Sequence, residues 1–145
     1  MITISELQPD EELKALLDGN VSIDISSKEV RIAKVYRQGE RPNTEFGDEF
    51  IEILHNGVIR AMTNPMGVYR GNLAVMLYCK SQSDGTVKFN RINSMLSQVE
   101  SLVSDKHSGK FFFKTSPANV ITPISHNSST GYTTLTLNIE WHTTE

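Results

Sequence analysis

The segment that decides the fold is 131–141, GYTTLTLNIEW, near the end of the chain. Apolar and polar residues alternate strictly along it, which is the period of a β-strand with one dry face and one wet face. The dry set is Leu135, Leu137, Ile139 and Trp141, and the wet set is Thr134, Thr136, Asn138 and Glu140. A single strand cannot form a sheet, so upstream segments must supply its neighbours and the cover for its dry face.

Three upstream segments are predicted to provide the neighbours and the cover. Asn72–Lys80 is apolar on both parities, which favours a central strand buried on both faces. From about Asn90 the apolar residues follow helical spacing, which predicts the main helix; they are Ile92, Met95, Leu96, Val99, Leu102 and Val103. A short helix is predicted from Asp10, with an acidic cap and first turn, an apolar stripe at Leu13, Leu16 and Leu17, and Gly19 as its stop.

A hairpin is the clearest local prediction. Phe50–His55 and Val58–Met62 flank Asn56-Gly57, a favoured pair for a type I′ turn. The stretch Thr63–Gly71, with one proline and two glycines, is then expected to be a connection.

The remaining segments complete the outline. Strands are predicted at Val21–Ile25, Val30–Tyr36 and Phe111–Lys114, with a proline-interrupted edge strand or bulge at Val120–Ile124. Arg37–Gly47 has no apolar rhythm and is expected to be an exposed loop or arm.

Together these elements predict one α+β domain over residues 1–145. Its sheet is mostly antiparallel, with one long helix packed on one face and the short N-terminal helix nearby. If the long helix is a crossover, a parallel pair makes the sheet mixed.

Composition excludes several classes of protein. The 145 residues carry a formal net charge of −3, so the chain as a whole has no strong electrostatic drive toward DNA or anionic lipid. The single cysteine rules out an intrachain disulfide. The first residues are too polar for a signal peptide, and no run approaches the roughly 20 apolar residues of a spanning helix, which predicts a cytosolic, soluble protein.

The chain carries no motif that predicts catalysis, a cofactor or a metal. Its four histidines, His55, His107, His126 and His142, lack ligand spacing and are expected in surface or turn positions. Cys79 lies in an apolar strand and is expected to be a buried, inert thiol. The acids at positions 10–12 are best explained by the start of a helix, and Glu49 and Glu52 should face opposite sides of a strand.

Two aromatic groups invite a functional interpretation. Single-strand platforms combine basic and aromatic residues of the kind found at Tyr69, Arg70, Lys80, Lys88, Phe89 and Arg91. Here they straddle a strand, a loop and a helix start, and the net charge is negative, so base recognition is not favoured. The run Phe111-Phe112-Phe113 exposes one or two rings unless something covers them; burial under the short helix and a subunit interface are the two alternatives.

The order of central strand, turn, helix, short strand and Gly-Tyr terminal strand resembles the phage tail terminator, or tail-completion, family. The matching residues cover roughly the C-terminal half: 71–80 (GNLAVMLYCK), Asp84-Gly85, the helix from Phe89 to Val103, 120–124 (VITPI) and 131–141 (GYTTLTLNIEW). Head-closure, tail-adaptor and tail-tube proteins are close competitors.

The resemblance implies a non-enzymatic structural protein of a phage or prophage virion, placed in the tail or neck and assembled in the cytoplasm of a bacterial host. It implies a homo-oligomeric ring, usually a hexamer, at the head-proximal end of the tail tube. Such a ring stops tube polymerisation, contacts the tail tube protein, and meets a head-completion or connector protein. DNA passes through its lumen without sequence-specific binding, and neither a membrane nor a cofactor is involved.

Contacts in such a ring are expected from the arm 37–47, the loop around Pro65 and the region Phe111–Lys114. The candidate interface residues are Arg37, Glu40, Arg41, Pro42, Phe46, Pro65, Tyr69, Phe111 and Phe113. The alternative is a small cytosolic α+β ligand-binding module or enzyme subunit of unknown substrate.

Overall fold

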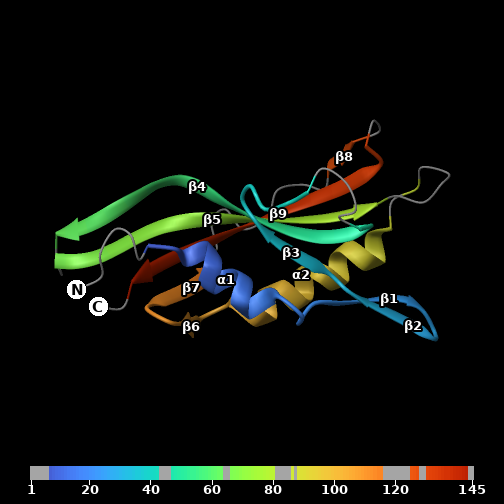
Figure 1. The fold of residues 1–145 in the computed structure, drawn as a ribbon, viewed down its shortest axis with the longest axis horizontal. Helices are drawn as coiled ribbons and strands as arrows, with labels where there is room; N and C mark the ends of the chain where they lie inside the picture. Colours follow the sequence, from blue (N-terminus) through green and yellow to red (C-terminus); the bar gives the residue numbers. More distant parts are fainter. Residues whose placement is uncertain are drawn as a thin grey trace.

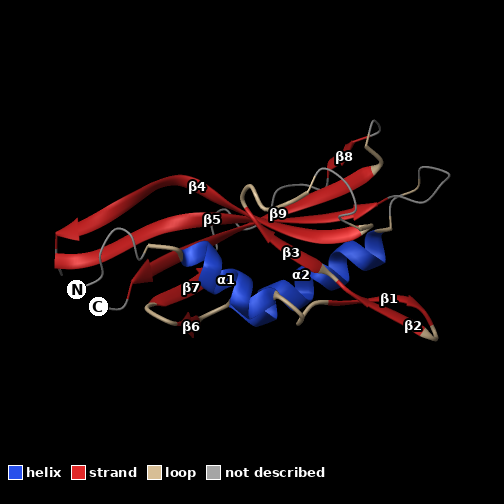
Figure 2. Cartoon of the chain, in the orientation of Figure 1, coloured by secondary structure: helices blue, strands red, loops and turns tan. Residues whose placement is uncertain are grey.

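The computed structural model describes residues 7–42, 47–63, 66–80, 86, 88–115, 125–127 and 130–143. Two helices lie together on one side of a long, twisted sheet (Figures 1 and 2). The elements along the chain are α1 (Pro9–Leu17), β1 (Ser22–Ser26), β2 (Glu29–Ile32), β3 (Lys34–Arg37), β4 (Glu49–Thr63), β5 (Met66–Lys80), α2 (Phe89–Val103), β6 (Lys106–Ser108), β7 (Phe111–Thr115), β8 (Ser125–Asn127) and β9 (Tyr132–Thr143).

The main sheet has the strand order β3-β4-β5-β9-β7-β6, and β8 also pairs with β9. Its neighbouring strands are antiparallel except β3 and β4, which are parallel, so the sheet is mixed. Because β5 and β7 both run antiparallel to β9 between them, the chain leaves β5, passes through α2 and returns in the same direction. The predicted α+β class is confirmed, with one long helix and one short N-terminal helix.

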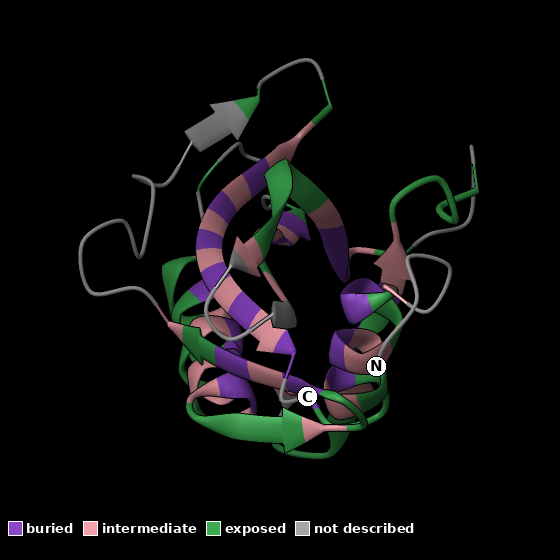
Figure 3. Cartoon of the chain, turned by 90° about the vertical axis from the view of Figure 1, so that its left-hand side faces the viewer, coloured by how far each residue is buried: buried purple, intermediate pink, exposed green. Residues whose placement is uncertain are grey.

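Strand β9 keeps the predicted alternation along its whole length. Leu135, Leu137, Ile139 and Trp141 are buried, whereas the residues between them are only partly buried. Figure 3 shows this alternation as purple and pink bands. Helix α2 lies on the buried side of the sheet, and its stripe of Ile92, Met95, Val99 and Val103 is fully buried in the same core.

Helix α1 confirms the predicted acidic first turn but not the acidic cap. Its N-cap is Gln8, whose side chain makes no capping hydrogen bond, and the helix begins at Pro9. Glu12 instead accepts a hydrogen bond of 2.7 Å from the Ser108 hydroxyl, which ties the helix to β6. The helix packs through Leu13 and Leu17, both fully buried.

The predicted hairpin at Asn56-Gly57 is wrong. Both residues lie inside β4, which continues to Thr63 and pairs with β5 as far as Met66. Gly57 does adopt the positive φ of 78° that suggested a turn, but it sits in a bulge where the register shifts between Asn56 and Arg60. A bulge meets the same conformational demand as a turn without reversing the chain.

The predicted connection Thr63–Gly71 is therefore wrong as well, because Met66–Gly71 belongs to β5. The central position predicted for Asn72–Lys80 is confirmed, since β5 pairs with β4 on one side and β9 on the other. Burial on both faces is not. Leu73, Val75, Leu77 and Cys79 are buried, but the alternate residues are only partly buried because neither of the two described helices covers that face.

Two further predictions changed in detail. The predicted strand Val30–Tyr36 is divided into β2 and β3 at Ala33, which is itself buried. Strands β1 and β2 form a separate two-stranded sheet. The strand predicted at Val120–Ile124 lies outside the described residues.

We expect Gly71→Ala to destabilise the fold. Gly71 of β5 pairs with Trp141 of β9, and a methyl group added at Gly71 would lie 2.7 Å from Cζ2 of the indole. Overpacking of this kind costs about 1–3 kcal/mol of unfolding free energy. Urea unfolding followed by the fluorescence of Trp141, the single tryptophan, measures the loss.

The matched control places Gly71→Ala in a Trp141→Phe background, followed by circular dichroism. Phenylalanine lacks the indole atoms that the new methyl would meet, so the cost of the substitution should shrink. An equal cost in both backgrounds would contradict the proposed clash.

Candidate assembly surfaces

The first part of the predicted arm, residues 37–42, is held against the body of the protein. The backbone N–H of Glu40 donates to the carbonyl of Arg37 at 2.9 Å, closing a turn. The Glu40 carboxylate accepts the backbone N–H of Arg37 at 2.7 Å and the ammonium of Lys14 at 3.0 Å. These two donors lower the pKa of Glu40. The turn is thus fastened to α1.

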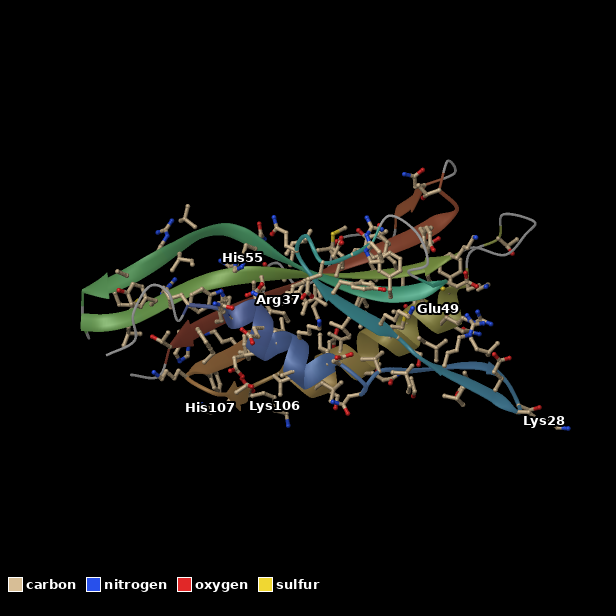
Figure 4. All side chains as sticks on the ribbon, viewed as in Figure 1. Lys28, Arg37, Glu49, His55, Lys106 and His107 are labelled. Carbon is tan, nitrogen blue, oxygen red and sulfur yellow. The ribbon has the colours of Figure 1, made fainter. Side chains whose placement is uncertain are left out.

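The Arg37 side chain joins the arm to the start of α1. Its Nε donates to Oδ2 of Asp10 at 2.9 Å, and Asp10 is buried. This hydrogen bond raises the pKa of Arg37. His55 Nε2 lies 3.6 Å from the same carboxylate oxygen, so β4 meets the pair too (Figure 4). The Arg37 guanidinium is therefore engaged within its own chain, so fewer of its N–H donors are available to a partner.

Arg41 lies over the uncovered face of the sheet. Its guanidinium carbon is 5.2 Å from the ring centre of Phe50 and 5.7 Å from that of Tyr78, and these two rings stack 4.3 Å apart. Its Nε lies 3.3 Å from Oε2 of Glu52. A cation over aromatic faces is attracted to them, so Arg41 pins the arm to the sheet.

The described end of the arm is fixed as well. The Tyr132 hydroxyl donates to the carbonyl of Gly47 at 2.6 Å, and the Tyr132 ring meets Phe50 edge to face. Phe50 is fully buried although it points away from the helices. The arm thus covers one end of a sheet face that no helix protects.

Several predicted interface residues have other positions. Phe111 and Phe113 lie in the core at 4% and 0% exposure, so the prediction that they face a partner is wrong for the surface of this chain. Both rings are buried in the common core, where β7 contacts α2, so burial is confirmed but not burial under the short helix in particular. Tyr69 is partly buried against the core, and Pro42 is exposed. Phe46 and Pro65 lie outside the described residues.

Sequence analysis missed two projecting two-stranded ribbons, which lie at opposite ends of the long axis (Figure 1). The β1–β2 ribbon exposes Val30 and Ile32 by 59% and 54%. The β4–β5 ribbon, residues 55–70, exposes Val58 and Ile59 by 66% and 44%. Among the described residues, Phe89 is the remaining large apolar side chain that is this exposed. Exposed apolar pairs at both ends are candidate contact surfaces.

The β1–β2 ribbon is fixed at its base by polar contacts. Glu49, buried in β4, accepts from Arg91 of α2 at 2.8 Å and from Arg31 of β2 at 3.2 Å. Gln98 of α2 also pairs with the backbone of Ser22, accepting its N–H at 2.9 Å and donating to its carbonyl at 2.7 Å. The ribbon therefore projects in a defined direction, with Lys28 at its tip (Figure 4).

Metal ligands and surface hollows can be assessed among the described residues. They contain no group of three His, Cys, Asp or Glu side chains able to hold a metal ion. A surface hollow of about 310 Å³ is lined by Asn20, Ser97, Gln98, Ser101 and Leu102, none of which ionises near neutral pH. None of the described helices is long and apolar enough to cross a membrane.

Cys79 should behave as a protected thiol. It is 2% exposed, and burial raises its pKa to about 11. Because the folded state holds the proton more tightly, its contribution to stability is complete below the unfolded pKa near 9 and is lost between about pH 9 and 11. A thiol reagent at pH 8 should label the native protein far more slowly than the urea-unfolded protein. Equal labelling rates would contradict the burial.

We expect Arg41→Ala to lower the unfolding free energy by about 1 kcal/mol, through loss of its cation–π contacts and of the Glu52 ion pair. Arg41→Lys keeps the charge but loses the planar group, so it should recover only part of the loss. Urea unfolding measures both variants. Full recovery by lysine would show that charge alone holds the arm.

No protein-family model matches the chain, and a search of curated proteins finds no match.

Proposed function

We propose that this protein is a structural assembly protein of a phage or prophage tail, similar to a tail terminator. Copies of it would form a ring at the head-proximal end of the tail tube, stop tube polymerisation and join the tail to the head connector. The proposal assigns no reaction to the chain. Its partners would be further copies of itself, the tail tube protein and a head-completion or connector protein.

The observation that carries the proposal is the pair of exposed apolar ribbons at opposite ends of the molecule. A two-stranded ribbon is marginally stable in water on its own. Each ribbon also presents two β-branched side chains to solvent, Val30 with Ile32 at one end and Val58 with Ile59 at the other. Covering these side chains with a partner would remove apolar surface from water and favour association.

The placement of the ribbons favours head-to-tail assembly over a two-fold dimer, and such assembly gives a ring when the rotation between subunits closes. A two-fold dimer uses the same patch on both subunits, whereas a ring joins two different patches head to tail. The two ribbons differ in sequence and lie at opposite ends (Figure 1). Each subunit can therefore offer one ribbon to the copy before it and the other to the copy after it.

The predicted contact segments fit this arrangement in part. The loop around Pro65 connects Thr63 to Met66, which pair with each other at the far end of the β4–β5 ribbon. In the described part of the arm, Arg41 and Gly47 contact residues of the outer face of the sheet, and Pro42 is exposed. These segments remain candidates for contacts with the tube or the connector.

The test uses one lesion at each end. We expect the parent protein to form closed rings, alone or with its tail-tube partner, in sedimentation and electron micrographs. Val58→Glu with Ile59→Glu should block one end, and Val30→Glu with Ile32→Glu the other, so each double variant should be monomeric. Mixing the two variants leaves one intact pair of ends and should give a heterodimer that grows no further.

A matched control places two glutamates on the exposed side of α2, at Asn90 and Ser101, and should still form rings. A parent protein that stays a compact monomer at high concentration, with no ring beside its tube partner, would refute the proposal. A stoichiometric small molecule or metal in the purified protein would favour the alternative ligand-binding module.

A further inference from the structure

The outer face of the sheet carries a row of cationic and aromatic side chains that no assigned role uses. The row follows the strand pairing directly: Arg60 of β4 pairs with Arg70 of β5, Arg70 with His142 of β9, His142 with Phe112 of β7, and Phe112 with His107 of β6. Directly paired residues point to the same face of a sheet. We call Arg60, Arg70, His142, Phe112 and His107 the cationic row.

The two arginines of the row are exposed and lack partners. Neither Arg60 nor Arg70 makes an ion pair or a side-chain hydrogen bond to any residue that the structure describes. Like charges directly opposite one another in an antiparallel pair repel and destabilise it. A bound anion would relieve this repulsion, because it would lie between two guanidinium groups whose donors match phosphate oxygens.

The other half of the row adds the rings of His107, Phe112 and His142, and the charge of Lys114 lies near them. The Phe112 ring lies between those of His107 and His142, with centres 4.9 Å and 5.2 Å away. Burial and the positive charges of Lys114, His107 and Arg70 lower the pKa of His142. The charges thus act on one another as a cluster. Glu140 is the acid beside it, and it pairs with Lys114 at 3.4 Å.

Beside the row on this face lie the Glu140–Lys114 ion pair and a group of asparagines. Asn56 donates to Asn138 at 3.2 Å, and Asn138 donates to Asn72 at 3.3 Å, so a ladder of amides borders the arginines. Protein–protein interface cores are depleted in charge, whereas nucleic-acid interfaces are polar and strongly positive. The row and its amide border therefore fit a nucleic acid better than a protein partner.

We propose that the cationic row binds the phosphate backbone of a nucleic acid without reading its sequence. Four strand spacings make the row about 19 Å long, and one strand of a duplex places a phosphate about every 3.4 Å along the axis, so roughly five or six phosphates can face it. The net charge of −3 means that binding is local, weak and sensitive to salt. This inference does not depend on ring formation.

Fluorescence anisotropy with labelled 20-nucleotide single strands and 20-base-pair duplexes tests the proposal. At 50 mM salt the parent protein should bind with a Kd in the micromolar range, equally for unrelated sequences. Arg60→Gln with Arg70→Gln should weaken binding by about tenfold and reduce the slope of log K against log salt by about 2 for the duplex. Because the repulsion is removed, the thermal midpoint of this variant should not fall.

The matched control is Lys34→Gln with Lys80→Gln, which removes the same charge from exposed positions. Lys80 lies about 34 Å along β5 from Arg70, at the far end of the sheet. This control should bind like the parent. Equal loss in both variants, binding to anionic lipid vesicles or an acidic peptide but not to DNA, or no binding at 50 mM salt would overturn the proposal.

The Val30→Glu, Ile32→Glu variant separates this proposal from the ring. If the row acts within one chain, that variant should still bind DNA as a monomer with the same change on loss of the two arginines. If the Val30→Glu, Ile32→Glu variant loses DNA binding while the Arg60→Gln, Arg70→Gln variant retains it, the cationic row is not the binding site.

Discussion

From Arg70–His142 to Lys80–Tyr132, β5 and β9 pair without a register shift, and this ladder determines which side chains of the sheet face the helices. A slip of one residue would turn every apolar side chain of β9 toward solvent. The close approach of Gly71 to the Trp141 indole favours this register, because a side chain at position 71 would force the indole or the backbone to move. The apolar faces of α1 and α2 then pack on the inner face of the sheet, whose side chains the pairing has already fixed.

The ladder also explains why the molecule has two different faces. Its inner side meets the helices and is dry, whereas its outer side is covered at one end by the arm and is polar and cationic at the other. Arg41 on Phe50 and the buried Glu49 with Arg91 hold peripheral segments by charge and geometry, in addition to the apolar burial of Ile23. These segments can therefore be positioned for contact without adding to the core.

Sequence patterns predicted the elements that are governed by burial. The alternation in 131–141 and the helical stripe from Ile92 to Val103 both depend on a single covered face, and both are confirmed. The hairpin at Asn56-Gly57 was wrongly predicted because a turn and a bulge both require a positive φ at the glycine, and only the pairing with β5 distinguishes them. Phe111 and Phe113 share a face that the core covers, which a run of three phenylalanines does not reveal. The cationic row joins residues from five strands, so no local pattern contains it.

The bulge at Gly57 separates two parts of β4 that differ in their neighbours. Before it, the strand pairs with β3 and β5, and its apolar side chains lie in the core or under the arm. Beyond it, the ribbon from Val58 to Val68 pairs mainly with itself. Its length can therefore change in steps of two residues per strand while the inner and outer faces of the sheet keep their identity. The distance that the ribbon spans can therefore be changed separately from the stability of the body.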